Sequence, residues 1–285
     1  MGRGQVQTLR ARVRIITAGV AAALTAAVLT GCSVFGLEEE TALECPGESA
    51  PTSAPGEARV LLTIAEGSSG WDLTTVIYDD GTVALLDGQP DGAATNAVGV
   101  AGSASRYAGG PYTDQPGSWH SGYLLPCALT ELRQRADSAM FGSPEYGRVS
   151  ITDNPWTYVT YDNGASRASV EVYAFDTGYT EGLEWSERRA RERLAAVTHF
   201  LEANLVSTGE AIPVSRVQVD GSADVGEGFE WPGPAPAELL GDQGCGVLTE
   251  EQATAVHEFA REPGLGEASQ QLTVRALPPG VSGCR

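Results

Sequence analysis

The chain of 285 residues contains no lysine, because all 18 of its basic residues are arginine. A Walker-A phosphate loop, a pyridoxal Schiff base and a Ser-x-x-Lys acylation site each need a lysine amine, so the sequence excludes these three kinds of site. Histidine is also scarce, with only His120, His199 and His257, which disfavours haem and histidine-rich metal sites. We therefore expect no cofactor. The 37 acidic residues give a formal net charge of −19, which disfavours nucleic acid because phosphate backbones are bound by arginine and lysine.

Long apolar runs are lacking as well. The most apolar stretch, residues 15–30, is shorter than the roughly 20 residues that a membrane-spanning helix requires. Four arginines and no acidic residue precede it, and it leads into the small residues Thr30 and Gly31 and then Cys32. This layout is typical of an export signal. The alternative is an uncleaved membrane helix with an incidental cysteine.

The sequence Leu29-Thr30-Gly31-Cys32 resembles the lipobox of bacterial lipoproteins. The resemblance implies that the Cys32 thiol carries a diacylglyceryl group, that residues 1–31 are a signal peptide removed before Cys32, and that the new amino terminus is acylated. The protein would then be held by lipid on the outer face of the cytoplasmic membrane. Without the four N-terminal arginines, 14 basic residues face 37 acidic ones, a formal charge of −23. Membrane contact is therefore expected through the lipid alone.

The residues after the lipobox predict a tether followed by a folded domain. Residues 32–57 contain Glu38-Glu39-Glu40 and a stretch rich in proline, glycine and serine, which is typical of a flexible linker. Residues 58–285 have enough apolar content for a packed α+β domain, either undivided or in two halves, 58–207 and 208–285.

Four cysteines remain for the folded part, and outside the cytosol they form a natural disulfide set with three pairings. We favour Cys45 with Cys127 and Cys245 with Cys284, because each of these pairs links a helix start to a nearby segment of its own half of the chain. Two such bonds would stabilise the fold by roughly 3 to 5 kcal/mol each in the chain-entropy model. No Cys-x-x-Cys is present, so a redox site or a zinc ribbon is unsupported.

Strand patterns predict two β-hairpins. Residues 74–78 and 82–86 flank Asp79-Asp80-Gly81, and residues 156–161 and 166–175 flank Asp162-Asn163-Gly164. Further strands are expected at 60–64, 214–219 and 272–277. Two stretches rich in glycine, proline and small residues, 87–123 and 220–243, predict loops.

Apolar periodicity predicts three helices. One begins at a capping Thr130 and stops at Gly142. The strongest begins at a capping Ser186 and buries one face, with a solvated opposite face that carries Arg188, Arg191, Glu192 and Glu202. The third runs from a capping box of Thr249 and Gln252 through Arg261.

Strands that cluster in hairpins instead of alternating with helices predict an α+β fold, with a largely antiparallel sheet, about three packed helices and two disulfides. The chain resembles a group of uncharacterised actinobacterial lipoproteins. The resemblance rests on the lipobox, on residues 76–83, 151–153 and 170–175, on the helix after Ser186, and on Trp231-Pro232, Cys245 and residues 274–280 before Cys284. It implies an envelope location and this fold class, and it carries no activity.

One stretch of the sequence is a candidate ligand site. Five aromatic side chains gather among glycines and prolines in the predicted loop: Tyr107, Tyr112, Trp119, His120 and Tyr123. Aromatic planes beside polar groups are surfaces on which sugars and peptides stack. The alternative is that these rings anchor an irregular loop onto the sheet.

Metal and catalytic motifs are few. Asp220, Asp224 and Glu227 lie in a glycine-containing loop that could bind Ca²⁺, although the spacing is not that of an EF-hand and acidic loops are common in so acidic a chain. No Gly-x-Ser-x-Gly and no His-Glu-x-x-His is present. We therefore expect no catalytic residue.

The sequence favours a non-enzymatic, lipid-anchored binding module for an envelope protein or a cell-wall component. The alternative is an envelope hydrolase that uses carboxylates, with residues 107–123 in its cleft. The two differ in a testable way. A hydrolase requires a pocket in which two carboxylates face each other and one of them has a raised pKa, whereas a binding module requires a shallow aromatic or apolar patch without such a pair.

Overall fold

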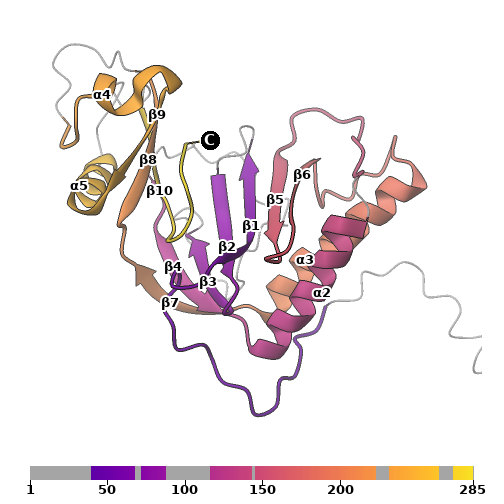
Figure 1. The fold of residues 1–285 in the computed structure, drawn as a ribbon. Helices are drawn as coiled ribbons and strands as arrows, with labels where there is room; N and C mark the ends of the chain where they lie inside the picture. The colour runs from indigo at the N-terminus through magenta and orange to yellow at the C-terminus, as the bar shows by residue number, and fades with distance from the viewer. Residues whose placement is uncertain are drawn as a thin grey trace, which may run out of the picture. The chain divides into compact units, whose positions relative to one another are not determined.

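Two antiparallel sheets organise the described part of the chain (Figure 1). The structure is a computed structural model that describes residues 40–67, 72–87, 116–142, 145–222, 231–262 and 272–284. The larger, seven-stranded sheet has the order β6-β5-β1-β2-β3-β4-β7. Its strands are β1 (Val60–Gly67), β2 (Asp72–Tyr78), β3 (Thr82–Leu86), β4 (Trp119–Tyr123), β5 (Trp156–Asp162), β6 (Arg167–Tyr173) and β7 (Val206–Ile212).

Both predicted hairpins are confirmed. β2 pairs with β3 and β5 pairs with β6, each antiparallel. The first turn needs glycine, because Gly81 has a φ of 90° and an added Cβ would lie 2.9 Å from the carbonyl oxygen of Leu124. In the second turn the side chain of Asn163 accepts the backbone N–H groups of Ala165 and Ser166, which is the local bonding that makes asparagine a turn former.

Two long helices cover one face of the large sheet. They are α2 (Pro126–Gly142) and α3 (Trp185–Asn204), and they run side by side (Figure 1). The apolar stripe that the sequence predicts for α3 is buried, with Ala190, Leu194 and Leu201 all at 0 % exposure in the main core. The fold is thus α+β, as predicted.

The predicted start of each long helix is wrong. Thr130 lies inside α2, which begins at Pro126, and the backbone N–H of Cys127 donates to the Glu48 carboxylate at 2.7 Å. Ser186 lies inside the first turn of α3, where the Glu187 carboxylate accepts the backbone N–H of the N-cap residue Glu184 at 2.7 Å. In both helices a glutamate satisfies a backbone donor near the start that the sequence assigned to a hydroxyl.

Arg191 of α3 is buried, although the sequence places it on the solvated face. Its guanidinium donates to the carbonyl oxygens of Tyr146, Gly147, Tyr173 and Ala174 at 2.6 to 3.4 Å. A buried charge is tolerated where all its donors find acceptors. This side chain therefore holds the loop at 145–147 and the end of β6 against α3.

A second, smaller sheet follows in the last third of the chain. Its order is β10-β8-β9, and its strands are β8 (Arg216–Gly221), β9 (Cys245–Thr249) and β10 (Leu272–Ala276). α4 (Pro236–Leu240) and α5 (Glu250–Ala260) pack on it around a core that includes Val217, Val219 and Val256. Thr249 is the N-cap residue of α5 as predicted, but its hydroxyl makes no capping bond.

Four stretches that the sequence left as loop or unassigned are strands or a helix. β4 lies in the predicted loop at 87–123, and α4 lies in the predicted loop at 220–243. β9 lies between that loop and the predicted capping box, and β7 follows α3 without an alternating pattern. Six of the seven residues of β7 are exposed. Because neither face of this strand is buried, its sequence carries no period of two.

The small sheet and the segment after β10, residues 277–284, pack on the face of the large sheet that α2 and α3 do not cover. We call residues 277–284 the C-terminal segment. Trp119 is 3 % exposed and donates its indole N–H to the carbonyl oxygen of Ala276 at 2.8 Å. The Tyr78 hydroxyl donates to the carbonyl oxygen of Pro279 at 2.7 Å. Both aromatic rings belong to one apolar cluster with Ala276 and with Val281 of the C-terminal segment.

Both favoured disulfides are present. Cys45 is bonded to Cys127 and Cys245 to Cys284, with Cα–Cα distances of 6.0 and 5.7 Å. The first bond attaches the segment before β1 to the start of α2. The second attaches the C-terminal segment to β9.

The segment at 40–57, which the sequence assigns to a tether, contacts the folded part at several points. The Leu43 N–H donates to Asn204 Oδ1 at 2.7 Å, and the Ser53 hydroxyl donates to Asp80. Arg135 of α2 lies 2.9 Å from Glu40. Among the described residues, no helix has the length and apolar character of a membrane span.

We predict that Trp119→Phe lowers the free energy of unfolding by about 1 to 3 kcal/mol, because it leaves the buried carbonyl of Ala276 without its donor. Urea unfolding of the purified protein would measure this loss. Tyr123→Phe is the matched control on the same strand and should change stability by less than about 0.5 kcal/mol. Equal stability of the two variants would contradict a docking role for the indole.

Candidate functional site

A cleft of about 500 Å³ lies between α5 and the end of β7. One wall is the exposed side of α5 and the two residues after it. It presents Thr254, His257, Glu258, Arg261 and Glu262. These positions recur at intervals of three and four, which places their side chains on one face of a helix.

The opposite wall comes from the large sheet and from the connection to the small one. It consists of Ala211 and Ile212 of β7, Val214 of the connection, and Ser118 just before β4. Ile212 and Val214 are half-buried and pack against the apolar cluster that contains Trp119. We call the apolar surface formed by Ala211, Ile212 and Val214 the floor of the cleft. The α5 wall that lies opposite it is charged. We call this site the α5–β7 cleft.

Three hydrogen bonds hold the walls together. The Thr254 hydroxyl donates to the carbonyl oxygen of Val214 at 2.9 Å. Nε2 of His257 lies 3.2 Å from the carbonyl oxygen of Gly117, and Arg261 donates to the Ser118 hydroxyl at 2.5 Å. Burial lowers the pKa of His257, which is 5 % exposed. A neutral imidazole with Nε2 protonated fits this bond, because a carbonyl can only accept.

The other charged side chains on the α5 wall are carboxylates. Glu258, in the last turn of α5, and Glu262, just after the helix, are both exposed. No cation of the described residues forms an ion pair with either of them. Two carboxylates against the single guanidinium of Arg261 leave the α5 wall with a net negative charge, which attracts a cationic group, and the surface opposite this wall is apolar.

The predicted aromatic site has a different role where the structure describes it. Trp119 is part of the docking cluster, so its prediction as an exposed ligand-stacking residue is wrong. Nδ1 of His120 lies 3.2 Å from the carbonyl oxygen of Gly209, and Nε2 lies close to the Asp87 carboxylate at 2.5 Å without hydrogen-bond geometry. Tyr123 is half-buried at the other end of β4. Tyr107 and Tyr112 lie outside the described residues.

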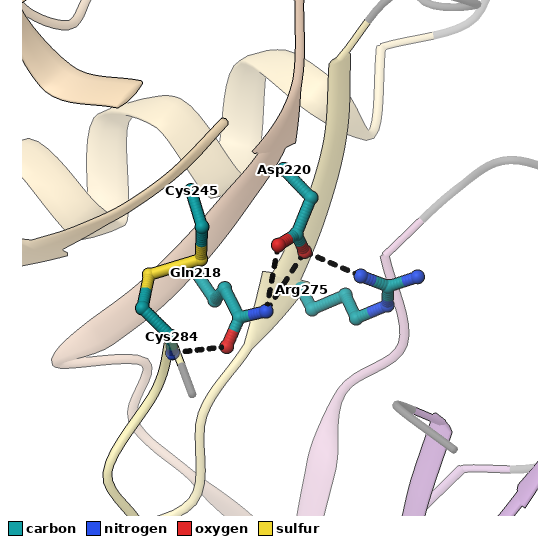
Figure 2. Close-up of a disulfide and its surroundings, with 5 residues drawn as sticks. All are labelled: Gln218, Asp220, Cys245, Arg275 and Cys284. Atoms are coloured by element: carbon teal, nitrogen blue, oxygen red, sulfur yellow. Dashed lines mark hydrogen bonds and ion pairs between the residues drawn. A yellow bond between two sulfur atoms is a disulfide. The ribbon is translucent and has the colours of Figure 1, made fainter. Parts of the chain in front are cut away.

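Asp220, the described member of the predicted Ca²⁺ site, is already neutralised by protein groups (Figure 2). Its carboxylate lies 2.5 Å from Arg275, and its two oxygens accept Nε2 of Gln218 at 2.9 and 2.8 Å. Gln218 in turn accepts the backbone N–H of Cys284. Asp220 thus braces β8 against β10 and the disulfide. Asp224 and Glu227 lie outside the described residues, as does Cys32, the predicted lipidation site.

Three potential metal ligands do lie together: Cys45, Glu48 and Cys127. The two cysteines are joined as a disulfide, and the Glu48 carboxylate accepts the N–H of Cys127. These groups are therefore used to fasten the segment before β1 to α2.

A carboxylate with a raised pKa occurs on α3. Burial raises the pKa of Glu202, the His199 cation opposes this, and the Asp176 carboxylate adds to it. Nε2 of His199 lies 3.0 Å from Asp176. Glu202 is not among the residues that line the α5–β7 cleft. Glu202 on α3 and the cleft carboxylates of Glu258 and Glu262 therefore lie at different places in the fold.

Comparisons of this chain with protein-family models, with curated proteins and with solved structures give no match. The assignment of function therefore depends on the site itself. Sequence reasoning missed the α5–β7 cleft because its walls come from residues 118, 211–214 and 254–262. The spacing of Thr254, Glu258 and Glu262 on one helix face was the signal available in the sequence.

We predict that the His199–Asp176 pair stabilises the protein at acidic pH. The hydrogen bond to Asp176 raises the pKa of His199, burial opposes it, and the carboxylates of Asp176, Glu202 and Glu40 add to it. A raised folded-state pKa gives stability that is complete below the unfolded value of about 6.5 and is lost as pH rises through the folded value.

His199→Gln should therefore cost about 0.5 to 1 kcal/mol more below pH 6 than above pH 8, the range of a partly exposed pair. Urea unfolding at the two pH values measures the difference. Asp176→Asn should reproduce it, and the double variant should add little. An equal cost at both pH values would contradict the pairing.

Proposed function

We propose that this protein is a lipid-anchored binding module of a bacterial cell envelope, held on the outer face of the cytoplasmic membrane by acyl chains at Cys32. The arginine-rich start, the short apolar run and the residues Thr30 and Gly31 before the cysteine support the anchor. Two or three acyl chains give stable attachment where one does not.

The contacts of residues 40–57 support a short attachment. A fully extended chain rises at most about 3.6 Å per residue, so residues 32–39 can span no more than about 29 Å. From Glu40 onward the chain contacts Arg135, and the Cys45–Cys127 bond then fixes it to α2. The attachment point of the folded domain would therefore be held close to the membrane.

The observation that carries the binding function is the α5–β7 cleft. It combines an apolar floor with exposed charges, which is the composition of surfaces that bind a ligand reversibly. Its groups that could take part in proton transfer or bind anions, His257 and Arg261, are engaged with Gly117 and Ser118 across the cleft. We infer that the partner is an envelope protein or a cell-wall component.

The hydrolase alternative has less support. It requires two facing carboxylates in one pocket, one of them with a raised pKa. Burial raises the pKa of Glu202 and the Asp176 carboxylate adds to this, but neither residue lines the cleft, where Glu258 and Glu262 lie. This separation favours binding over hydrolysis.

For the anchor, we predict that Cys32→Ser accumulates as an uncleaved precursor without lipid, because the serine hydroxyl does not replace the thiol as acceptor of the diacylglyceryl group. Detergent phase partitioning and mass spectrometry of the N-terminus measure this. Gly31→Ala keeps a small residue before the cysteine and should be processed normally. Lipid-dependent partitioning of the serine variant would refute lipidation at this position.

For the binding site, we predict that a photoreactive benzoylphenylalanine in place of Ala211 captures a discrete partner in intact cells, whereas the same group in place of Ser207 does not. Both positions are exposed on β7, and only Ala211 lines the cleft. Immunoblots and mass spectrometry after irradiation measure the products. Identical products from the two positions would contradict a partner site in the cleft.

A further inference from the structure

The carboxylates of the α5–β7 cleft determine whether it favours a cationic or an anionic ligand. Arg261, the cation of the α5 wall, donates to the Ser118 hydroxyl. Glu258 and Glu262 have no ion-pair partner in the part of the chain that the structure describes, and the whole chain has a net charge of −19. Like-charged ligands are repelled by such a surface and cations are attracted to it.

The floor of the cleft selects a cation with an apolar stem. Ala211, Ile212 and Val214 lie opposite the two carboxylates and expose hydrocarbon to the cleft. Lysine and arginine side chains bury three or four methylene groups against such a surface while their charged ends stay hydrated. A side chain of this kind can cover Ile212 and reach a carboxylate on α5 at the same time.

The edge of the large sheet runs into the same cleft. β7 is the last strand in the order, and in the described ranges it pairs with β4 alone. An edge strand presents unpaired N–H and C=O groups, to which an extended peptide can bond as a further strand. The other edge strand, β6, carries the charged side chains of Arg167 and Glu171, which are among the residues that discourage strand addition.

A bulge limits where a peptide can pair with β7. Residues 208–210 of β7 stand opposite the single residue Ser121, between the pairs His120–Ala211 and Gly122–Ser207. Pro213 has no N–H to donate, and the N–H and C=O groups of successive strand residues point to opposite edges, so one residue of the pair Ala211 and Ile212 faces β4 and the other is open to a peptide. These are the two β7 residues that line the cleft.

We propose that the α5–β7 cleft binds an extended polypeptide segment with a lysine or arginine side chain. The backbone of this segment lies along Ala211 and Ile212 of β7. The apolar stem of its lysine or arginine side chain covers Ile212 and Val214, and the cationic end of that side chain binds Glu258 and Glu262. This inference rests on the proposed binding function and names the chemical class of the partner.

The test measures the affinity of the full-length protein in detergent for a synthetic peptide of alternating alanine and lysine, by titration calorimetry at low salt. Glu258→Gln with Glu262→Gln should weaken binding about tenfold, as expected for the loss of two exposed ion pairs. The matched control, Glu238→Gln with Glu251→Gln, removes two exposed charges that do not line the cleft. It should change affinity less than about twofold.

Equal weakening by the two double variants would overturn the proposal, because the peptide would then respond to net charge alone. Free lysine amide that competes as well as the peptide would also overturn it, since the cleft would then take a small cation. If the peptide does not bind but the group at position 211 still captures a partner in cells, this inference fails and the proposed function stands. If neither occurs, both fail.

Discussion

The docking of the small sheet on the large one is the constraint on which the candidate site depends. The α5 wall of the cleft belongs to the small sheet, and the β7 wall belongs to the large one. Their separation is fixed by the bond from the Trp119 indole to Ala276 and by the bond from the Tyr78 hydroxyl to Pro279. Aromatic side chains suit this work because they bury a large apolar area and still carry one directed donor.

The C-terminal segment is attached to both sheets and so helps to hold them together. Its residues contact Tyr78 on the large sheet, and the Cys245–Cys284 bond fastens its end to β9. Gln218 and Asp220 add polar bracing at the same point (Figure 2), where Gln218 accepts the Cys284 N–H and Asp220 lies against Arg275. Residues that look like a candidate metal loop in the sequence thus contribute to the rigidity of the small sheet.

The sequence predicted the parts of the fold that have local causes. The Asp-Gly and Asn-Gly turns, the buried stripe of α3 and the α+β class follow from turn chemistry and periodicity. The start of α2 was misplaced because Glu48, which accepts an N–H near this start, lies 79 residues from Cys127. The start of α3 was misplaced although its cap is local, because a glutamate pair, Glu184 and Glu187, caps it in place of a hydroxyl. β7 was not predicted, because an exposed edge strand has no apolar face and therefore no alternating pattern in its sequence. The burial of Arg191 was not predicted, because its acceptors are backbone carbonyls of two other segments and helical periodicity contains no information about them.

The sequence by itself determined the composition, the absence of lysine chemistry, the cysteine set and the acidic charge, since these depend on which residues are present and on short spacings. Only the tertiary structure decided that Trp119 packs inside, that Asp220 is neutralised, and that Ala211, Val214 and Glu258 line one cleft. The physical reason is distance along the chain. A site whose walls are joined by bonds such as those from Arg261 to Ser118 and from His257 to Gly117 spans 140 residues or more of sequence, and it exists only after the two sheets have packed.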